Sequence, residues 1–147
     1  MTHPSHVAAA AVLLVSPADR ILMVQTFNRL GAGLILPGGM VEADESPTAA
    51  AAREVAEEVG LLIAVGRLLV VEHRSPADGR PGNLQFVFAA QCPVEESLPL
   101  TLQPEEIAEA HWVDRDQVVQ RHTLMGQPRL RAALAAFDSG VPAYLES

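Results

Sequence analysis

Short apolar runs separated by turn-forming residues fill the first part of the chain, a pattern typical of strands. Nine consecutive apolar residues span Val7–Val15, and Ser16–Asp19 then supplies the Ser, Pro and Asp of a turn. Arg20–Thr26 is therefore expected to return as the second strand of a hairpin. After a loop with two glycines, Leu34–Leu36 is expected to form a short buried strand.

A helical spacing replaces this pattern between Ser46 and Gly60. Ser46 is a good N-cap, Pro47 suits the first helical position, and Gly60 is the residue at which the helix is expected to end. Four apolar residues recur at the i, i+3, i+4 and i+7 positions and are expected to face the core: Ala52, Val55, Ala56 and Val59.

The remaining chain predicts further strands and then helices. Further apolar runs and strands are expected over 61–65, 68–71, 84–91 and 107–113. Asp114 is expected to cap a short helix through Val119, and the spacing of apolar residues over 124–137 predicts a last helix. This order favours a single domain over 1–147 of the α+β class, with a mixed sheet and helices on its faces.

The charge balance narrows the range of partners. Asp and Glu number 18 against 10 Lys and Arg, for a formal net charge of −8, so attraction to nucleic acid or to an anionic membrane is not expected. The apolar run near the N-terminus is too short to span a bilayer, and no Lys or Arg precedes it as a secretory signal requires. The single cysteine, Cys92, cannot form an internal disulfide. We therefore expect a cytoplasmic protein.

Carboxylates are concentrated between Gly38 and Leu61, where Arg53 is the one basic residue. The six acids are Glu42, Asp44, Glu45, Glu54, Glu57 and Glu58. The last three share one face of the predicted helix, so their like charges repel unless a cation neutralises them. A hard divalent cation suits such oxygen ligands and commonly binds together with substrate phosphates. The alternative is a solvated acidic face, but a Gly-Gly turn precedes this helix and its apolar stripe is expected to turn the acids out of the core.

This stretch resembles the signature of the Nudix hydrolases. Gly39, Glu45 and Arg53–Leu61 fill all nine defined positions of the pattern G-x5-E-x7-R-E-U-x-E-E-x-G-U, in which U is a bulky aliphatic residue. At residue frequencies of about 7 %, the seven fixed letters match by chance on the order of 10⁻⁸ per start position. The resemblance implies an α/β/α sandwich. It also implies an enzyme that uses Mg²⁺ or Mn²⁺ and water to cleave a phosphoanhydride in a nucleoside diphosphate linked to another group.

The resemblance assigns roles to individual residues of the signature. Its metal-binding positions fall on the Gly38 carbonyl, Glu54, Glu57 and Glu58. In some members the residue at the position of Glu54 acts as the base instead. Arg53 and Glu45 match a pair that orients the loop and the metal-binding glutamates, and a purely structural ion pair is the alternative.

The general base varies within the family, and some members use a glutamate outside the signature. Here Glu106 is the candidate, with Glu105 and Glu109 beside it and His111 as a further candidate for contact with substrate. For each of these residues, an ordinary solvated or structural role is the alternative.

Substrate recognition is expected to lie outside the signature, on Phe27, Arg29 and Arg74. Phe27 lies in the region where family members often contact the substrate, and the two arginines are candidate phosphate contacts. Packing in the core or exposure to solvent is the alternative for each. Pro76 lies fifteen residues after Leu61 and resembles the spaced proline of ADP-ribose pyrophosphatases, while a MutT-like action on nucleoside triphosphates stays open.

Two classes of function follow. The complete signature favours a catalytic hydrolase acting on a small nucleotide substrate, and a non-catalytic, nucleotide-sensing Nudix-like module is the alternative. The apolar tail over 141–146 is expected to dock on its own domain or on a partner subunit. Because many Nudix enzymes are dimers, we expect a homodimer.

Overall fold

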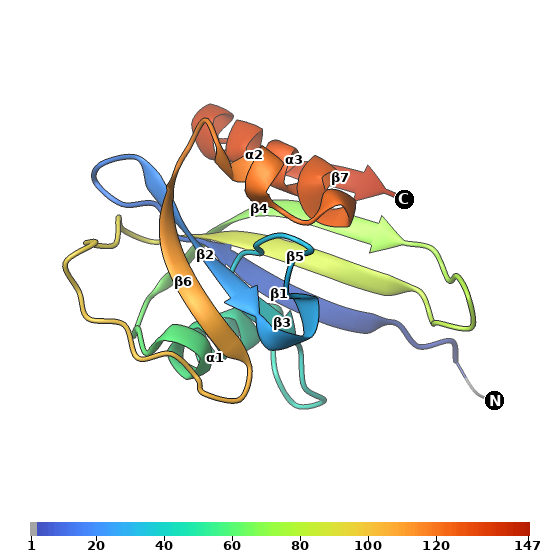
Figure 1. Ribbon diagram of the computed structural model, residues 1–147. Helices are drawn as coiled ribbons and strands as arrows, with labels where there is room; N and C mark the ends of the chain where they lie inside the picture. The colour runs from blue at the N-terminus through green and yellow to red at the C-terminus, as the bar shows by residue number, and fades with distance from the viewer. Residues whose placement is uncertain (1–2) are drawn as a thin grey trace.

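The computed structural model describes residues 3–147, and Figure 1 shows a central sheet with helices on both faces. The strands are β1 (Val7–Leu13), β2 (Arg20–Thr26), β3 (Gly38–Met40), β4 (Val65–Arg74), β5 (Asn83–Ala90), β6 (Ile107–Asp114) and β7 (Ala143–Glu146). The helices are η1 (Phe27–Arg29), α1 (Pro47–Val59), α2 (Val118–Arg121), η2 (Leu124–Gly126) and α3 (Gln127–Ser139), where η denotes a 3-10 helix.

Five strands form one mixed sheet in the order β3-β1-β5-β4-β7, and β2 and β6 form a separate antiparallel ribbon. Within the sheet, β1 pairs with β5 and β4 pairs with β7 in parallel, while the other pairs are antiparallel. In Figure 1, α1 covers one face of the sheet and α3 covers the other. This arrangement confirms the predicted α+β sandwich with a mixed sheet.

Two hydrophobic cores lie on opposite sides of β1. Leu13 belongs to the core beneath α3, with Leu130 and Ala133 of that helix. Val12 belongs to the core beneath α1, with Val55. The strand therefore buries both faces, which explains why its sequence is an unbroken apolar run and does not alternate with polar residues.

Helix α1 begins and ends where its sequence predicts. The Ser46 hydroxyl accepts a hydrogen bond from the Ala49 N–H at 3.1 Å, and Gly60 adopts the left-handed conformation with φ of +74°. The predicted core stripe is wrong in part, because Ala52 and Ala56 are only half-buried. The residues that α1 buries are Ala50, Ala51, Val55, Glu58 and Val59. The helix is thus rotated enough to carry one of its glutamates inward.

The predicted β1–β2 hairpin forms at its turn, where the Ser16 N–H donates to the Arg20 carbonyl oxygen at 2.8 Å, but is wrong beyond it. The two strands meet only at the Val15–Ile21 bridge, because β3 and β5 take both edges of β1. Strand β2 pairs with β6 instead, from Arg20 opposite Asp114 to Gln25 opposite Glu109. This separate ribbon carries the chain to the end of the sheet where η1 begins.

Smaller differences concern short segments. The stretch predicted as a strand over 34–36 makes only single bridges, although Leu34 and Leu36 are buried. The predicted cap at Asp114 is wrong, because that residue ends β6 and Gln117 is the residue before α2. The tail pairs as β7 with β4 and so docks on its own domain.

Within 3–147, no helix combines the length and apolar character that crossing a membrane demands. The homodimer and the cytoplasmic location stay predictions.

We expect Leu22→Ala to lower the free energy of unfolding by about 2–5 kcal/mol, because this fully buried β2 side chain fills the core beneath α1. Leu62→Ala is the matched control, since Leu62 is 93 % exposed and its truncation should change stability by less than about 0.5 kcal/mol. Urea unfolding of both variants measures the difference, and equal losses would contradict the two-core architecture.

Candidate active site

Two adjacent glycines allow α1 to approach the edge of the sheet. Gly38 pairs with Ala11 in β1, and a Cβ at position 38 would lie 2.3 Å from the Ala10 carbonyl oxygen. A Cβ on Gly39 would lie 2.5 Å from the Cδ atom of Glu54. Glycine is needed at position 38, because the clash there is with the backbone of β1. A side chain at position 39 would displace the Glu54 carboxylate from its place against β3.

Arg53 holds the acidic segment together. Its guanidinium donates two hydrogen bonds to Glu45, at 2.7 and 2.9 Å, and one to the Met40 carbonyl oxygen at 3.0 Å. It also reaches Glu54 at 3.0 Å and Glu57 at 3.2 Å. The bidentate bond from Arg53 lowers the pKa of Glu45 to about 2, so this carboxylate is ionised at neutral pH. The expected orienting pair is thus present, and Arg53 links it to two of the expected metal ligands.

The three glutamates of the signature have different environments. Glu57 is half exposed, Glu54 is mostly buried, and Glu58 is only 2 % exposed. The expectation that all three acids face away from the core is therefore wrong for Glu58. The reason is local, since the Gly38 N–H points at α1 and donates a 2.8 Å hydrogen bond to the Glu58 Oε1.

Burial changes the proton affinity of these acids. Loss of water around Glu58 raises its pKa to about 8, against the opposing effect of the Gly38 N–H, and nearby Glu54, Glu106 and Glu57 raise it further. Burial also raises the pKa of Glu54, although Arg53 opposes this shift. Negative charge is thus crowded here beyond what Arg53 alone neutralises, and a divalent cation would relieve the excess.

An acidic cavity of about 380 Å³ opens beside Glu58. Its lining residues are Thr26, Phe27, Asn28, Arg29, Ile35, Gly38, Glu58, Glu105 and Glu106. The structure therefore brings the candidate base Glu106 and the candidate substrate contacts Phe27 and Arg29 to the buried signature glutamate. Glu109 lies elsewhere, on β6 opposite Gln25, and its Oε1 is 3.8 Å from the His111 Nε2. Neither Glu109 nor His111 lines this cavity.

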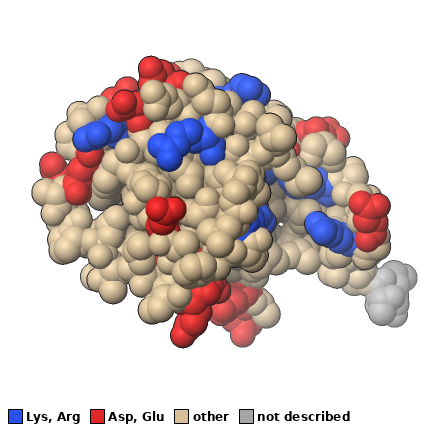
Figure 2. All heavy atoms as spheres, in the orientation of Figure 1, with Lys and Arg blue, Asp and Glu red and all other residues tan. Residues whose placement is uncertain are grey.

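A basic cavity of about 350 Å³ adjoins the acidic one and shares Arg29, Ile35 and Gly38 with it. Its lining residues include Arg29, Arg74, His122, Gly126 and Arg129. Arg74 thus meets Arg29 at one site, although Arg74 ends β4 and Arg29 ends η1. Figure 2 shows acidic side chains along the lower edge of the visible face and basic side chains around the hollow at the right.

Gln25 is a residue of this site that the sequence analysis missed. Its side chain is buried within β2, and its Nε2 donates to the carbonyl oxygens of Thr26 at 3.1 Å and Arg29 at 2.9 Å. These bonds fix the turn that carries Phe27 and Arg29 into the acidic cavity. The sequence did carry a signal for this role, because Gln25 is a polar residue inside a largely apolar predicted strand. His122 and Arg129 were missed as well, and no local pattern marks either residue.

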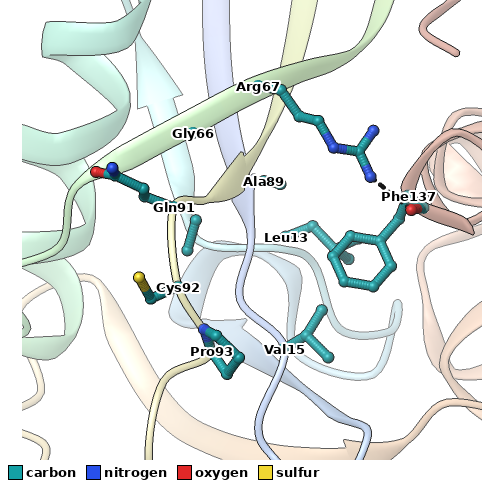
Figure 3. Close-up of a pocket in the computed structure, with 10 residues that line it drawn as sticks. Leu13, Val15, Gly66, Arg67, Ala89, Gln91, Cys92, Pro93 and Phe137 are labelled. Atoms are coloured by element: carbon teal, nitrogen blue, oxygen red, sulfur yellow. Dashed lines mark hydrogen bonds between the residues drawn. The ribbon is translucent and has the colours of Figure 1, made fainter. Parts of the chain in front are cut away.

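Another pocket, shown in Figure 3, lies at the opposite ends of β1 and β5, beside Leu13 and Ala89. It contains Cys92 but no carboxylate. Its arginine, Arg67, donates hydrogen bonds to the last carbonyls of α3, at Ala136 and Phe137. With its one cation already bonded, this pocket lacks the groups that phosphate chemistry needs.

The donor set of α1 fits a hard divalent cation. Glu54, Glu57 and Glu58 offer carboxylate oxygens beside the Gly38 backbone, and oxygen ligands are those that Mg²⁺ and Mn²⁺ prefer. Across residues 3–147, no three acidic, His or Cys side chains already converge tightly enough to hold an ion. Glu54 and Glu57 are instead bonded to Arg53. Ligation by all three would therefore require these two carboxylates to turn.

An α/β/α sandwich with a glutamate-rich helix against a Gly-Gly strand defines a hydrolase of the Nudix class. A family model described as NUDIX domain matches residues 4–137, so the chain belongs to the Nudix family and is a Nudix hydrolase. The chain is 29 % identical over 135 residues to Phosphatase NudJ of Escherichia coli strain K12, covering 92 % of this chain and 84 % of that protein.

Solved structures support the same fold. The E. coli ORF135 protein aligns with a TM-score of 0.74 at 21 % identity, covering 95 % of this chain and 96 % of that one. The MutT protein from Methanosarcina mazei Go1 aligns with a TM-score of 0.71 at 21 % identity, covering 95 % and 98 % of the two chains. At these identities the likeness concerns the fold alone.

We expect the metal-free protein to lose stability as the pH rises from about 4.5 to about 8. The unfolded Glu58 releases its proton near the ordinary pKa of 4.5, whereas the folded carboxyl keeps it up to about 8. The folded state therefore binds more protons across this window, and its advantage shrinks as the pH rises. Melting temperatures in EDTA should decline less steeply for Glu58→Gln than for the wild type. Parallel curves for the two proteins would contradict the burial of an ionisable group at this position.

Proposed function

We propose that this Nudix hydrolase uses Mg²⁺, or Mn²⁺ in its place, to hydrolyse a phosphoanhydride bond in a nucleoside diphosphate linked to another group. The observation that carries the proposal is the meeting of Glu58 with Gly38 at a cavity that Glu106 and Arg29 also line. Glu54 and Glu57 lie on the same helix as Glu58, where Arg53 pairs with both of them. The name of the relative Phosphatase NudJ agrees with chemistry at phosphorus. The substrate is ADP-ribose-like or a nucleoside triphosphate.

Glu54, Glu57, Glu58 and the Gly38 carbonyl are the groups that would hold the cation. Bound there, Mg²⁺ would neutralise charge on the phosphate oxygens and make a coordinated water more acidic. Arg53 positions the glutamates through its bonds to Glu54 and Glu57, while its bidentate bond to Glu45 fixes its own orientation. This support from Arg53 keeps the carboxylates close together in spite of their mutual repulsion.

Glu106 is the residue that we assign as general base. It lines the acidic cavity with Glu58, and its backbone carbonyl accepts a 2.9 Å hydrogen bond from the Phe27 N–H, which fixes its segment beside η1. A carboxylate there can take a proton from the water that attacks phosphorus as the anhydride bond breaks and the second phosphate leaves. Glu54 is the alternative base, because Arg53 and burial hold its carboxylate against Gly39.

Phe27 and the two arginines supply the substrate contacts. The Phe27 ring is half exposed at the acidic cavity, where it can stack on a nucleobase. Arg29 borders both cavities and Arg74 borders the basic one, so their guanidiniums can bind phosphate oxygens. Local cations of this kind offset the net charge of −8, which would otherwise repel an anionic substrate.

We expect Glu57→Gln to lower kcat by at least about 100-fold without unfolding the protein, because it removes charge from the metal-binding face. Glu57 is half exposed, so its substitution should leave the melting temperature of the metal-free protein nearly unchanged. Glu95→Gln is the control, since it makes the same chemical change at an exposed position on a different surface.

The assay follows Mg²⁺-dependent product release from ADP-ribose, NADH, diadenosine polyphosphates, and normal and oxidised nucleoside triphosphates. Turnover of one class that stops on addition of chelator supports the proposal. Turnover by Glu57→Gln at the wild-type rate would exclude Glu57 as a metal ligand. No turnover of any substrate by the folded, Mg²⁺-loaded wild type would contradict the proposed substrate class.

A further inference from the structure

The charge of the basic cavity is opposite to that of the whole protein. The chain has 10 basic residues, all arginine, against 18 acidic ones. Three of those arginines, Arg29, Arg74 and Arg129, line this one cavity, and no Asp or Glu is among its lining residues. The adjoining acidic cavity has three glutamates, and Arg29 is its one arginine. The site is thus divided into an acidic end and a basic end.

Two of the three guanidiniums are available to a ligand. Among residues 3–147, neither Arg29 nor Arg74 makes an ion pair with a carboxylate. Arg129 pairs with Glu72, which is buried, and this bond anchors the Arg129 side chain in the cavity wall. An anion that contacts Arg29 and Arg74 would therefore find the Arg129 guanidinium held in place beside them, with its charge balanced by Glu72.

His122 lies at the same wall of the basic cavity. It is buried, and its Nδ1 lies 2.9 Å from the Thr123 carbonyl oxygen. Burial lowers the pKa of His122, the hydrogen bond to the Thr123 backbone opposes this shift, and the charges of Arg129 and Arg29 lower the pKa further. The uncompensated positive charge at this wall comes from Arg29 and Arg74, because Arg129 is paired with Glu72.

The N-terminus of α3 adds to this field. The helix has 13 residues, Gly126 precedes it without a side-chain cap, and both Gly126 and Arg129 line the basic cavity. The helix dipole places partial positive charge at this end. The first positions offer no free N–H donor, because the Gln127 N–H donates to the Leu124 carbonyl oxygen and Pro128 has no N–H. A Cβ at Gly126 would lie 2.3 Å from the His122 Cε1, so a larger residue there would displace the His122 ring.

The two cavities meet at Arg29 and Gly38, so one ligand can occupy both. With the cleaved anhydride at the glutamates, the remainder of the substrate would extend toward Arg74 and Arg129. We propose that the basic cavity binds a further phosphoryl group of the substrate, one that lies beyond the two phosphates of the cleaved bond. This assignment of a subsite rests on the proposed function only for the placement of the cleaved bond.

A further phosphoryl group has two sources, the end of a longer polyphosphate chain or a phosphate ester on a sugar. Isothermal titration calorimetry in EDTA with ADP and ATP tests the first source, and NADH and NADPH test the second. We expect the wild type to bind the member with the additional phosphate about tenfold more tightly in at least one pair, since charge-assisted hydrogen bonds supply the difference.

Arg74→Gln should abolish that preference while leaving the melting temperature near the wild-type value. Arg80→Gln is the matched control, because it removes the same charge from an exposed position in the loop that follows Arg74 and does not line the cavity. Retention of the preference in Arg80→Gln and its loss in Arg74→Gln support the subsite. Equal losses in the two variants would show only a long-range effect of charge and would overturn the proposal.

Other outcomes separate this proposal from the proposed function. If the wild type binds all four ligands without preference, or binds none of them in EDTA, the subsite is excluded even where Mg²⁺-dependent hydrolysis is observed. If the preference depends on Arg74 but no substrate is hydrolysed with Mg²⁺, the subsite stands and the proposed function fails.

Discussion

Repulsion among the carboxylates of α1 is the constraint on which the rest of this structure depends. Glu54, Glu57 and Glu58 lie within five residues of one helix, and the pKa of Glu58 rises to about 8 as burial and its neighbours oppose its ionisation. Arg53 offsets part of this charge, and the glycines of β3 let the helix approach the sheet. The well-packed core beneath α1 then holds the acids in a place that is unfavourable without a cation.

The parts of the fold that were predicted from sequence are those that local chemistry decides. Ser46, Pro47 and Gly60 define α1 without reference to the rest of the chain, and the signature fixes the spacing of its acids. The strand that pairs with β2 was predicted wrongly as β1. Pairing depends on which edges of β1 remain free, and β3 and β5 occupy both of them. The burial of Glu58 was missed for a similar reason, since its hydrogen-bond donor lies 20 positions away in the chain.

The site shows the same division between local and distant information. The signature identified Arg53 and the three glutamates, and the structure brings Phe27, Arg29 and Glu106 to Glu58, the one of these glutamates that lines the acidic cavity. The basic cavity was less accessible to sequence reasoning. It joins η1, the end of β4 and the start of α3, so that Arg29, Arg74 and Arg129 meet only after folding.

The most direct test of a metal site on α1 is the binding of Mn²⁺ to the protein, measured from the free-ion signal in electron paramagnetic resonance. We expect the wild type and Glu95→Gln to bind Mn²⁺ equally, and Glu58→Gln to bind it at least about tenfold more weakly while remaining folded. Equal binding by all three proteins would show that the buried glutamate of α1 is not a ligand and would contradict a metal site built on this helix.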